Sequence, residues 1–332
     1  MRSLQNSVKI EGVDTVRAVA ALSVVFAHLL GPSMPGLSKY LFTGHPAVIA
    51  FFVVSGFCIH YPYRTRMLQV GPFLAGRFIR IVPPAAAAFI LAQALGMRAY
   101  NPIDGYILWS VVCEAVYYCL YPLILATSRR IGWPLLIAGS VLASYGVAIG
   151  VGPDQYGNAQ AYGPQLNWVV GLPAWLLGCY LAENLHCLKL PGNVWGWRAA
   201  TAVTASALYW ATMNTAAGFY LTMVPFSALA ACWILAEIRN ASERGPINAL
   251  EAIGSACFSI YLVHVIAAAV IEWFVTTPIV VCAVSLALVI PFYRWIEKPC
   301  HGAARRAKAT MEQLAARRRL EERDGIAISD GA

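Results

Sequence analysis

The chain has 332 residues, of which 59% are hydrophobic and only 12% are charged. Soluble globular domains usually carry about 25% charged residues, so this composition leaves too little polar surface for a soluble protein. The net charge of +8 does not indicate nucleic-acid binding, because the basic residues gather on one side of the expected membrane topology.

Apolar segments recur along almost the whole chain. A spanning helix needs roughly 20 mostly apolar residues, and the ten candidate segments are residues 13–31, 46–62, 78–97, 103–126, 133–151, 166–184, 199–213, 219–237, 253–274 and 278–294. The sequence therefore predicts an all-α polytopic membrane protein with about ten transmembrane helices. Residues 1–298 form one predicted transmembrane domain. Residues 299–332 form a charged tail, which is expected to be a solvated or membrane-surface helix without a catalytic role.

Basic residues set the expected orientation. If the N-terminus lies in the cytoplasm, all of the 24 Lys and Arg residues except Lys39 and Arg98 fall on the cytoplasmic side. Short cytoplasmic loops of membrane proteins carry such an excess of positive charge. Both termini are therefore predicted to be cytoplasmic.

Arg17 and His28 both lie in the first predicted span. Eleven residues make three helical turns plus roughly 20°, so the two side chains share one face, about 16 Å apart along the axis. Arg17 is expected near the cytoplasmic rim and His28 toward the outer half of the membrane. A buried imidazole can act as a general base, because it exchanges protons near neutral pH. The alternative is a histidine that only hydrogen-bonds a neighbouring helix.

Arg77 and Arg80 open the third predicted span at the cytoplasmic face. Guanidinium groups bind phosphates through paired hydrogen bonds. Together with Arg17, these residues could form a three-arginine anion site at one rim. The alternative is ordinary anchoring of a helix end by basic residues.

Glu114 lies in the middle of the fourth predicted span. An acidic side chain near the bilayer centre costs on the order of 2.5–3.5 kcal/mol, so it normally faces the bundle interior and has a partner. Tyr117 and Tyr118 follow it, and Tyr118 lies one helical turn on, on the same side. Glu114 is therefore a candidate site residue, and Tyr117 is a candidate for a supporting role. The alternative is a structural ion pair between Glu114 and an arginine.

Three further residues are weaker candidates for supporting roles. Asp14 precedes Arg17 by three residues and could pair with it on the helix face. Ser55 is followed by a glycine, a combination that permits close helix packing. His264 lies within the ninth predicted span, where packing and function both remain open. His60 lies near the cytoplasmic end of a span and is expected at the surface.

The nine cysteines are an odd number, and none falls in a segment predicted to lie outside the membrane. Free thiols are therefore expected, and no pair has metal-ligand spacing, so no metal site is predicted. The sequence contains no Gly-x-Ser-x-Gly, Walker A or His-Glu-x-x-His motif. Serine hydrolase, NTPase and zinc protease classes therefore lack support.

Six segments carry a family resemblance when they are taken together: VDTVRAVAALSVVFAHL, FFVVSGFCIHYPY, GRFIRIVPP, WSVVCEAVYYCLYP, FSIYLVHV and RWIEKP. In this order, and over nearly the whole chain, the sequence resembles the membrane-bound acyltransferase 3 family, which includes bacterial O-antigen, exopolysaccharide and Nod-factor O-acetyltransferases. Two motifs depart from the usual pattern. A threonine follows the aspartate of the first motif where glycine is common, and Cys-Glu stands where Glu-Glu is frequent.

The resemblance implies ten helices in the bacterial inner membrane. It implies transfer of an acyl group, by default acetyl, from acyl-CoA at the cytoplasmic face to a hydroxyl of a carbohydrate or lipid-linked glycan, with no bound cofactor. By this resemblance Arg17, Arg77 and Arg80 would bind the CoA phosphates. His28 would be catalytic and Glu114 an essential buried acid.

A transporter or flippase for a glycosylated or acylated substrate is the alternative function. Buried His and Glu residues suit proton coupling, but the chain shows no paired half-chain repeat of the kind that many transporters have. A membrane scaffold or sensor without chemistry would leave the buried His and Glu unexplained.

Overall fold

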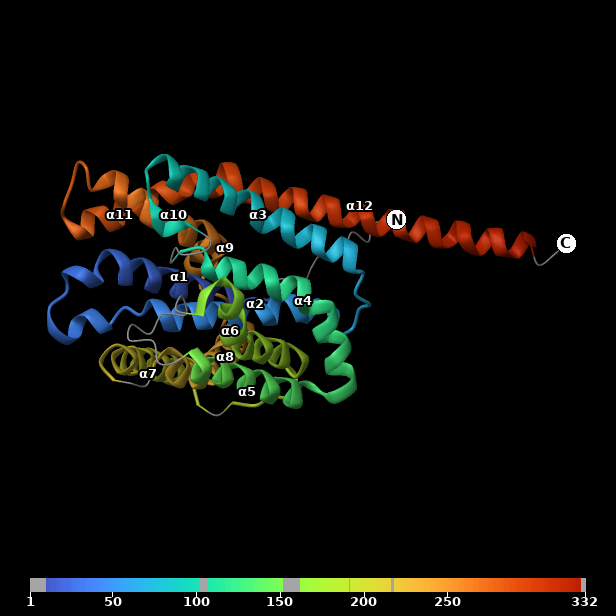
Figure 1. Cartoon of the computed structure of the whole chain (residues 1–332), viewed down its shortest axis with the longest axis horizontal. Helices are drawn as coiled ribbons and strands as arrows, with labels where there is room; N and C mark the ends of the chain where they lie inside the picture. The colour runs from blue at the N-terminus through green and yellow to red at the C-terminus, as the bar shows by residue number, and fades with distance from the viewer. Residues whose placement is uncertain (1–9, 102–106, 152–161, 191, 216–217, 330–332) are drawn as a thin grey trace.

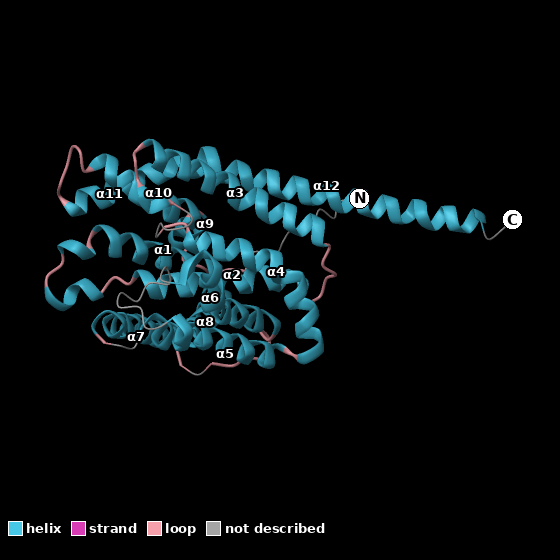
Figure 2. Ribbon diagram, in the orientation of Figure 1, coloured by secondary structure: helices cyan, strands magenta, loops and turns pink. Residues whose placement is uncertain are grey.

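The computed structural model describes residues 10–101, 107–151, 162–190, 192–215 and 218–329, the side chains of 218–221, 223 and 318–329 excepted. Its regular elements are helices, and no described residue forms a strand (Figure 2). The α-helices are α1 (Val13–Leu29), α2 (Gly44–His60), α3 (Val70–Ala94), α4 (Trp109–Ile131), α5 (Trp133–Val151), α6 (Gly163–Glu183), α7 (Val194–Asn214), α8 (Gly218–Arg244), α9 (Asn248–Ser255), α10 (Cys257–Ile271), α11 (Pro278–Phe292) and α12 (Lys298–Ser329). A π-helical turn, Tyr293–Glu297, joins α11 to α12.

Each of the ten predicted spans overlaps one or two of these helices, although residues 103–106 of the fourth lie outside the described residues. Five helical stretches in the described part of the chain are long and apolar enough to cross a membrane: Gly36–Tyr63, Val70–Ala94, Trp109–Ile131, Trp133–Val151 and Pro278–Arg317. The bent pair α9 and α10 adds a sixth if it forms one span. An all-helical, multi-pass membrane protein is thus confirmed. The count of ten spans and the cytoplasmic placement of both termini stay predictions.

The ninth predicted span, residues 253–274, is wrong as one continuous helix. α9 and α10 are separated at Ala256 and bend by 68° relative to one another. Both helices pack on α1, and α9 does so at very short range. A Cβ on Gly254 would lie 1.9 Å from the carbonyl oxygen of Asp14, so only glycine permits this crossing.

The third predicted span begins too late in the sequence. α3 starts at Val70 rather than at residue 78, and Pro72 stands in its first turn, where a missing N–H costs nothing. Pro83 lies in the helix interior without ending it. Arg77 and Arg80 therefore lie two to three turns inside α3 and do not open it.

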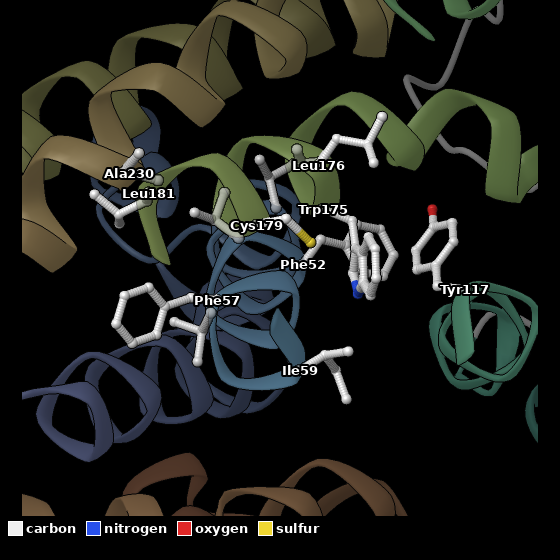
Figure 3. Close-up of a cluster of buried hydrophobic side chains, with 14 of the residues drawn as sticks. Phe52, Phe57, Ile59, Tyr117, Trp175, Leu176, Cys179, Leu181 and Ala230 are labelled. Atoms are coloured by element: carbon white, nitrogen blue, oxygen red, sulfur yellow. The ribbon is translucent and has the colours of Figure 1, made fainter. Parts of the chain in front are cut away.

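The core around α2 and α6 depends on close contact between these helices. A Cβ on Gly56 of α2 would lie 1.9 Å from the Trp175 carbonyl oxygen, and one on Gly178 of α6 would lie 2.0 Å from the Val53 carbonyl oxygen. In Figure 3, Tyr117 from α4 faces Trp175, and their ring centroids are 5.4 Å apart. The close packing expected at the Ser-Gly pair in α2 is thus confirmed.

Two buried carboxylates hold the first turns of α1 and α10. Glu251 accepts hydrogen bonds at Oε1 from the backbone N–H groups of Gly12, at 3.1 Å, and Thr15, at 3.0 Å. Glu297 accepts at Oε2 from the Ser259 N–H, at 2.9 Å, and from the Ser259 hydroxyl. The first N–H groups of a helix have no partner within it, and negative charge is favourable there. These two carboxylates therefore fix the positions of α1 and α10.

The expectation that His60 lies at the surface is wrong. Its side chain is 1% exposed. Its Nδ1 lies 3.0 Å from the Tyr121 hydroxyl and its Nε2 lies 2.5 Å from a Glu183 carboxylate oxygen, while the Trp133 ring packs against it. The end of α2 is thus covered by residues from α4, α5 and α6, which its place in an apolar run does not reveal.

α12 runs alongside α3 and then projects beyond the other helices (Figure 1). A glycine faces the contact between them, because a Cβ on Gly76 would lie 3.5 Å from the Lys308 Cβ. The Lys308 ammonium also donates to the Tyr63 hydroxyl at 3.0 Å. The first part of the charged tail is therefore packed against the helical body, not surrounded by solvent.

Candidate active site

Two cavities lie next to one another and share a wall of basic and thiol side chains. The residues that line both are Arg17, Cys58, Arg77 and Arg80. α1, α2 and α3 supply them, so three helices that are separate in sequence converge here. The predicted three-arginine cluster is therefore present.

The larger of the two is called the outer cavity, and the smaller is called the inner cavity. The outer cavity has a volume of about 570 Å³, within the range of about 300–1,000 Å³ that is typical of ligand pockets. Its walls come from the start of α1, the turn after α2, the first half of α3, and α12. Six arginines and one lysine line it: Arg17, Arg64, Arg66, Arg77, Arg80, Arg305 and Lys308. Among the described lining residues, Asp14 is the acidic one. Such a concentration of positive charge attracts anions.

The inner cavity is much smaller, at about 120 Å³. Apolar side chains from α2, α3, α4 and α10 form most of its wall. Beyond the arginines and thiols, the polar groups that line it are Ser55, Ser110, Glu114, Tyr118 and Tyr261. Its volume is about one fifth of that of the outer cavity.

Hydrogen bonds and ring contacts hold the arginines of the shared wall. Arg17 donates from Nη1 to the Asp14 carboxylate at 2.8 Å and from Nη2 to the Cys58 sulfur at 3.4 Å. The predicted Asp14–Arg17 pair is thus present. The Arg77 guanidinium lies over the ring of Tyr118, 5.9 Å from its centroid. Both arginines are therefore presented to the cavities in fixed positions.

Glu114 accepts a hydrogen bond from the Tyr118 hydroxyl, one helical turn along α4. Among the described residues its partner is therefore a phenol, and the alternative of a structural ion pair with an arginine finds no support. Tyr118 in turn contacts Arg77. The carboxylate, the phenol and the guanidinium form a continuous polar edge along one side of the inner cavity.

A second polar group lies on the α10 side of the inner cavity. The Ser110 hydroxyl donates to the Tyr261 hydroxyl at 2.8 Å, and the Tyr261 hydroxyl donates to the Ile107 carbonyl oxygen. Tyr261 lies three residues before His264, which is one turn of α10. The inner cavity therefore ends about one helical turn from His264.

His28 and His264 form a pair, with the Nδ1 of His28 2.8 Å from the Nε2 of His264. The His264 Nδ1 lies 2.9 Å from the carbonyl oxygens of Ile260 and Tyr261. Because a carbonyl oxygen only accepts, the proton is assigned to Nδ1 of His264, and its Nε2 accepts from Nδ1–H of His28. In a neutral His28, Nε2 then carries the basic lone pair.

The two histidines differ in access. His264 is fully buried, whereas the side chain of His28 is exposed at the end of α1. Neither lines the two described cavities. The pair therefore lies between the inner cavity and the outside of the helical bundle.

The structure brings together most of the sequence-predicted residues. Asp14, Arg17, Arg77 and Arg80 line the outer cavity, and Ser55 and Glu114 line the inner one together with the three arginines. Tyr117 does not join them. It is fully buried, and its hydroxyl donates to the Trp168 carbonyl oxygen at 2.8 Å, so its role is in the core packing of α4 against α6.

Sequence reasoning missed several lining residues. Ser110 and Tyr261 have no signal in the sequence, because their contact joins residues 151 positions apart. His301, Ala304, Arg305 and Lys308 of α12 do have one, since their spacing places them on one helical face. The expected free thiols are confirmed for all nine cysteines. No group of His, Cys, Asp and Glu in the described part of the chain could hold a metal ion.

Fold and cavities together define a multi-pass helical membrane protein with a strongly basic cavity beside a small, largely apolar one. Residues 10–294 match the family model of an acyltransferase domain, that of the acyltransferase 3 family. The chain belongs to this family and is a membrane acyltransferase. No curated protein and no solved structure matches it.

Proposed function

We propose that the protein transfers an acyl group, by default acetyl, from acyl-CoA at the cytoplasmic face of the bacterial inner membrane to a hydroxyl of a carbohydrate or lipid-linked glycan. The observation that carries this proposal is the arginine wall between the two cavities. It stands where a large basic cavity meets a small, largely apolar one. CoA has the matching shape, since its phosphates lie at one end and a thin pantetheine arm leads to the thioester.

Arg17, Arg77 and Arg80 bind donor phosphates at this wall. Guanidinium groups pair with phosphate oxygens through two hydrogen bonds, and the contacts to Asp14 and Tyr118 orient two of the three arginines in advance. The pantetheine arm then lies in the inner cavity, where Ser55 and Glu114 offer partners for its amide groups. Glu114 is in position to contact the donor close to its reactive end.

The acyl group reacts at His28. The acceptor hydroxyl loses its proton to Nε2 as its oxygen attacks the thioester carbonyl, and the carbon–sulfur bond breaks as the proton passes on to the CoA thiolate. The products are an ester and CoA, and the step as written uses no metal. His264 acts as a positioning residue, because its bond to Nδ1 of His28 keeps Nε2 basic.

A second route uses the same nitrogen, with Nε2 first taking the acyl group and then passing it to the hydroxyl. The two routes make different predictions for the exchange of labelled CoA into acetyl-CoA when no acceptor is present. An acyl-histidine intermediate supports this exchange, and direct transfer does not.

The test of the proposed function is the turnover of labelled acetyl-CoA by the purified protein, with membranes from a deletion strain as the source of acceptor. His28→Gln should lower turnover by at least about a hundredfold, the scale of general-base catalysis. His186→Gln, at an exposed histidine that lines neither cavity, is the matched control. Substrate movement across vesicles without loss of the acyl group would instead establish a transporter.

The acceptor class is tested in cells. Surface glycans of a deletion strain should lack O-acetyl groups that the parent carries, and a His28→Gln allele should fail to restore them. Full restoration by that allele would remove the catalytic assignment of His28.

A further inference from the structure

Four basic side chains in the outer cavity lie beyond the arginine wall. Arg64 and Arg66 come from the turn after α2, and Arg305 and Lys308 come from α12. The family match ends at residue 294, so α12 lies outside it. We propose that these four residues, defined here as the outer cation cluster, bind the 3′-phosphate of acyl-CoA, which makes α12 part of the donor site. This inference rests on the proposed function.

The face of α12 that meets the cavity is specific. His301, Ala304, Arg305 and Lys308 line it, and their spacing of three, four and seven residues follows one side of a helix. Arg306, the next residue in sequence, is exposed and does not line the cavity. Retention of positive charge on the cytoplasmic side explains why α12 is basic, but it does not explain why two of its cations share a cavity with five arginines from other segments.

Contacts on α12 and on the turn after α2 hold two of the four cations, Lys308 and Arg64. The Lys308 ammonium donates to the Tyr63 hydroxyl, and the Arg64 guanidinium lies 4.1 Å from the Tyr61 ring centroid. Glu312 lies 3.8 Å from Lys308 and balances part of its charge. Lys308 therefore ties α12 to the turn after α2, and Arg64 is held within that turn.

Donor chemistry explains why two cation groups are needed. CoA carries a diphosphate next to the pantetheine arm and a separate phosphate on the ribose 3′ position. The arginine wall, next to the inner cavity, suits the diphosphate, because the arm must continue inward from it. The second phosphate then lies farther out, where the outer cation cluster lines the same cavity.

The experiment compares the affinities of the purified full-length protein for CoA and for dephospho-CoA, which lacks only the 3′-phosphate. The wild type should bind CoA at least about tenfold more tightly, as expected for hydrogen bonds to a charged group. The double variant Arg305→Gln/Lys308→Gln should lose most of this preference while its affinity for dephospho-CoA stays the same. Arg306→Gln is the matched control and should keep the preference.

Distinct results overturn the inference and the proposed function. Equal weakening of both ligands in the double variant, or a preference as large as in the Arg306→Gln control, would overturn the role of α12. A wild type without preference for CoA would overturn it too. A wild type that binds neither ligand would instead remove the acyl-CoA donor itself. Arg305 is exposed, so the single Arg305→Gln variant keeps the test open if the double variant is unstable.

Discussion

The hydrogen bond from His28 to His264 predicts a measurable positioning effect on the acyl transfer. His264→Leu removes the acceptor at Nε2 that lies 2.8 Å from the Nδ1 of His28. The His28 ring can then turn, and its proton can move to Nε2, the nitrogen that the reaction needs unprotonated. The variant should therefore have a lower kcat and an unchanged KM for acetyl-CoA, because the arginine wall is untouched.

The magnitude follows from the loss of one hydrogen bond. A hydrogen bond contributes about 0.5–1.5 kcal/mol net, and about 1.4 kcal/mol corresponds to a factor of ten. The expected loss in kcat for His264→Leu is therefore about two- to twelvefold. Loss of the base itself in His28→Gln should cost at least about a hundredfold. Because His264 acts only through His28, His264→Leu added to His28→Gln should lower turnover no further.

Partial rescue separates a positioning role from simple packing. The amide oxygen of His264→Gln can still accept from Nδ1 of His28, so this variant should turn over faster than His264→Leu. The assay is turnover of labelled acetyl-CoA at saturating and at low donor concentration, with thermal melting as a check on folding. Equal kcat in the Gln and Leu variants, or a loss that appears only in KM, would refute the positioning role.

The remaining predictions concern the cavity walls and the core. Arg77→Ala and Arg80→Ala should each raise the KM for acetyl-CoA at least about tenfold, because charged hydrogen bonds to phosphate are lost. The change in kcat should be smaller. Unchanged KM values would remove both residues from the donor site. Glu114→Gln should keep donor binding and lower turnover, whereas wild-type turnover would exclude a role near the thioester. Gly178→Ala should destabilise the fold by at least about 1–3 kcal/mol, because its Cβ would lie 2.0 Å from the Val53 carbonyl oxygen, and an unchanged melting temperature in detergent would contradict that packing.

Much of the helical layout could be predicted from the sequence, because apolar runs of spanning length are unambiguous in a chain with 12% charge. The pairing of Asp14 with Arg17 was equally accessible, since helical spacing places residues three apart on one face. The arginine cluster could be predicted only as a possibility. Its assembly depends on α1 and α3 facing the same two cavities, which no local pattern reports.

What could not be predicted depends on tertiary contact. The break between α9 and α10 lies beside the close approach of Gly254 to the backbone of Asp14, and no proline in α9 or α10 marks it. The sequence does not distinguish packing from function for His264, because its partner, His28, lies 236 positions away. Tyr117 lies near Glu114 in sequence, yet its hydroxyl belongs to the contact with α6.

Glu297 connects the start of α12 to the start of α10. It ends the π-helical turn directly before α12, and its carboxylate holds the N–H and hydroxyl of Ser259 in the first turn of α10. Ser259 precedes His264 by five residues on the same rigid helix. The base of α12 is therefore tied to the helix that carries His264, and a tilt of α12 at its base would have to move or break these hydrogen bonds. One carboxylate thus links the base of the helix that lines the outer cavity to the helix that carries His264.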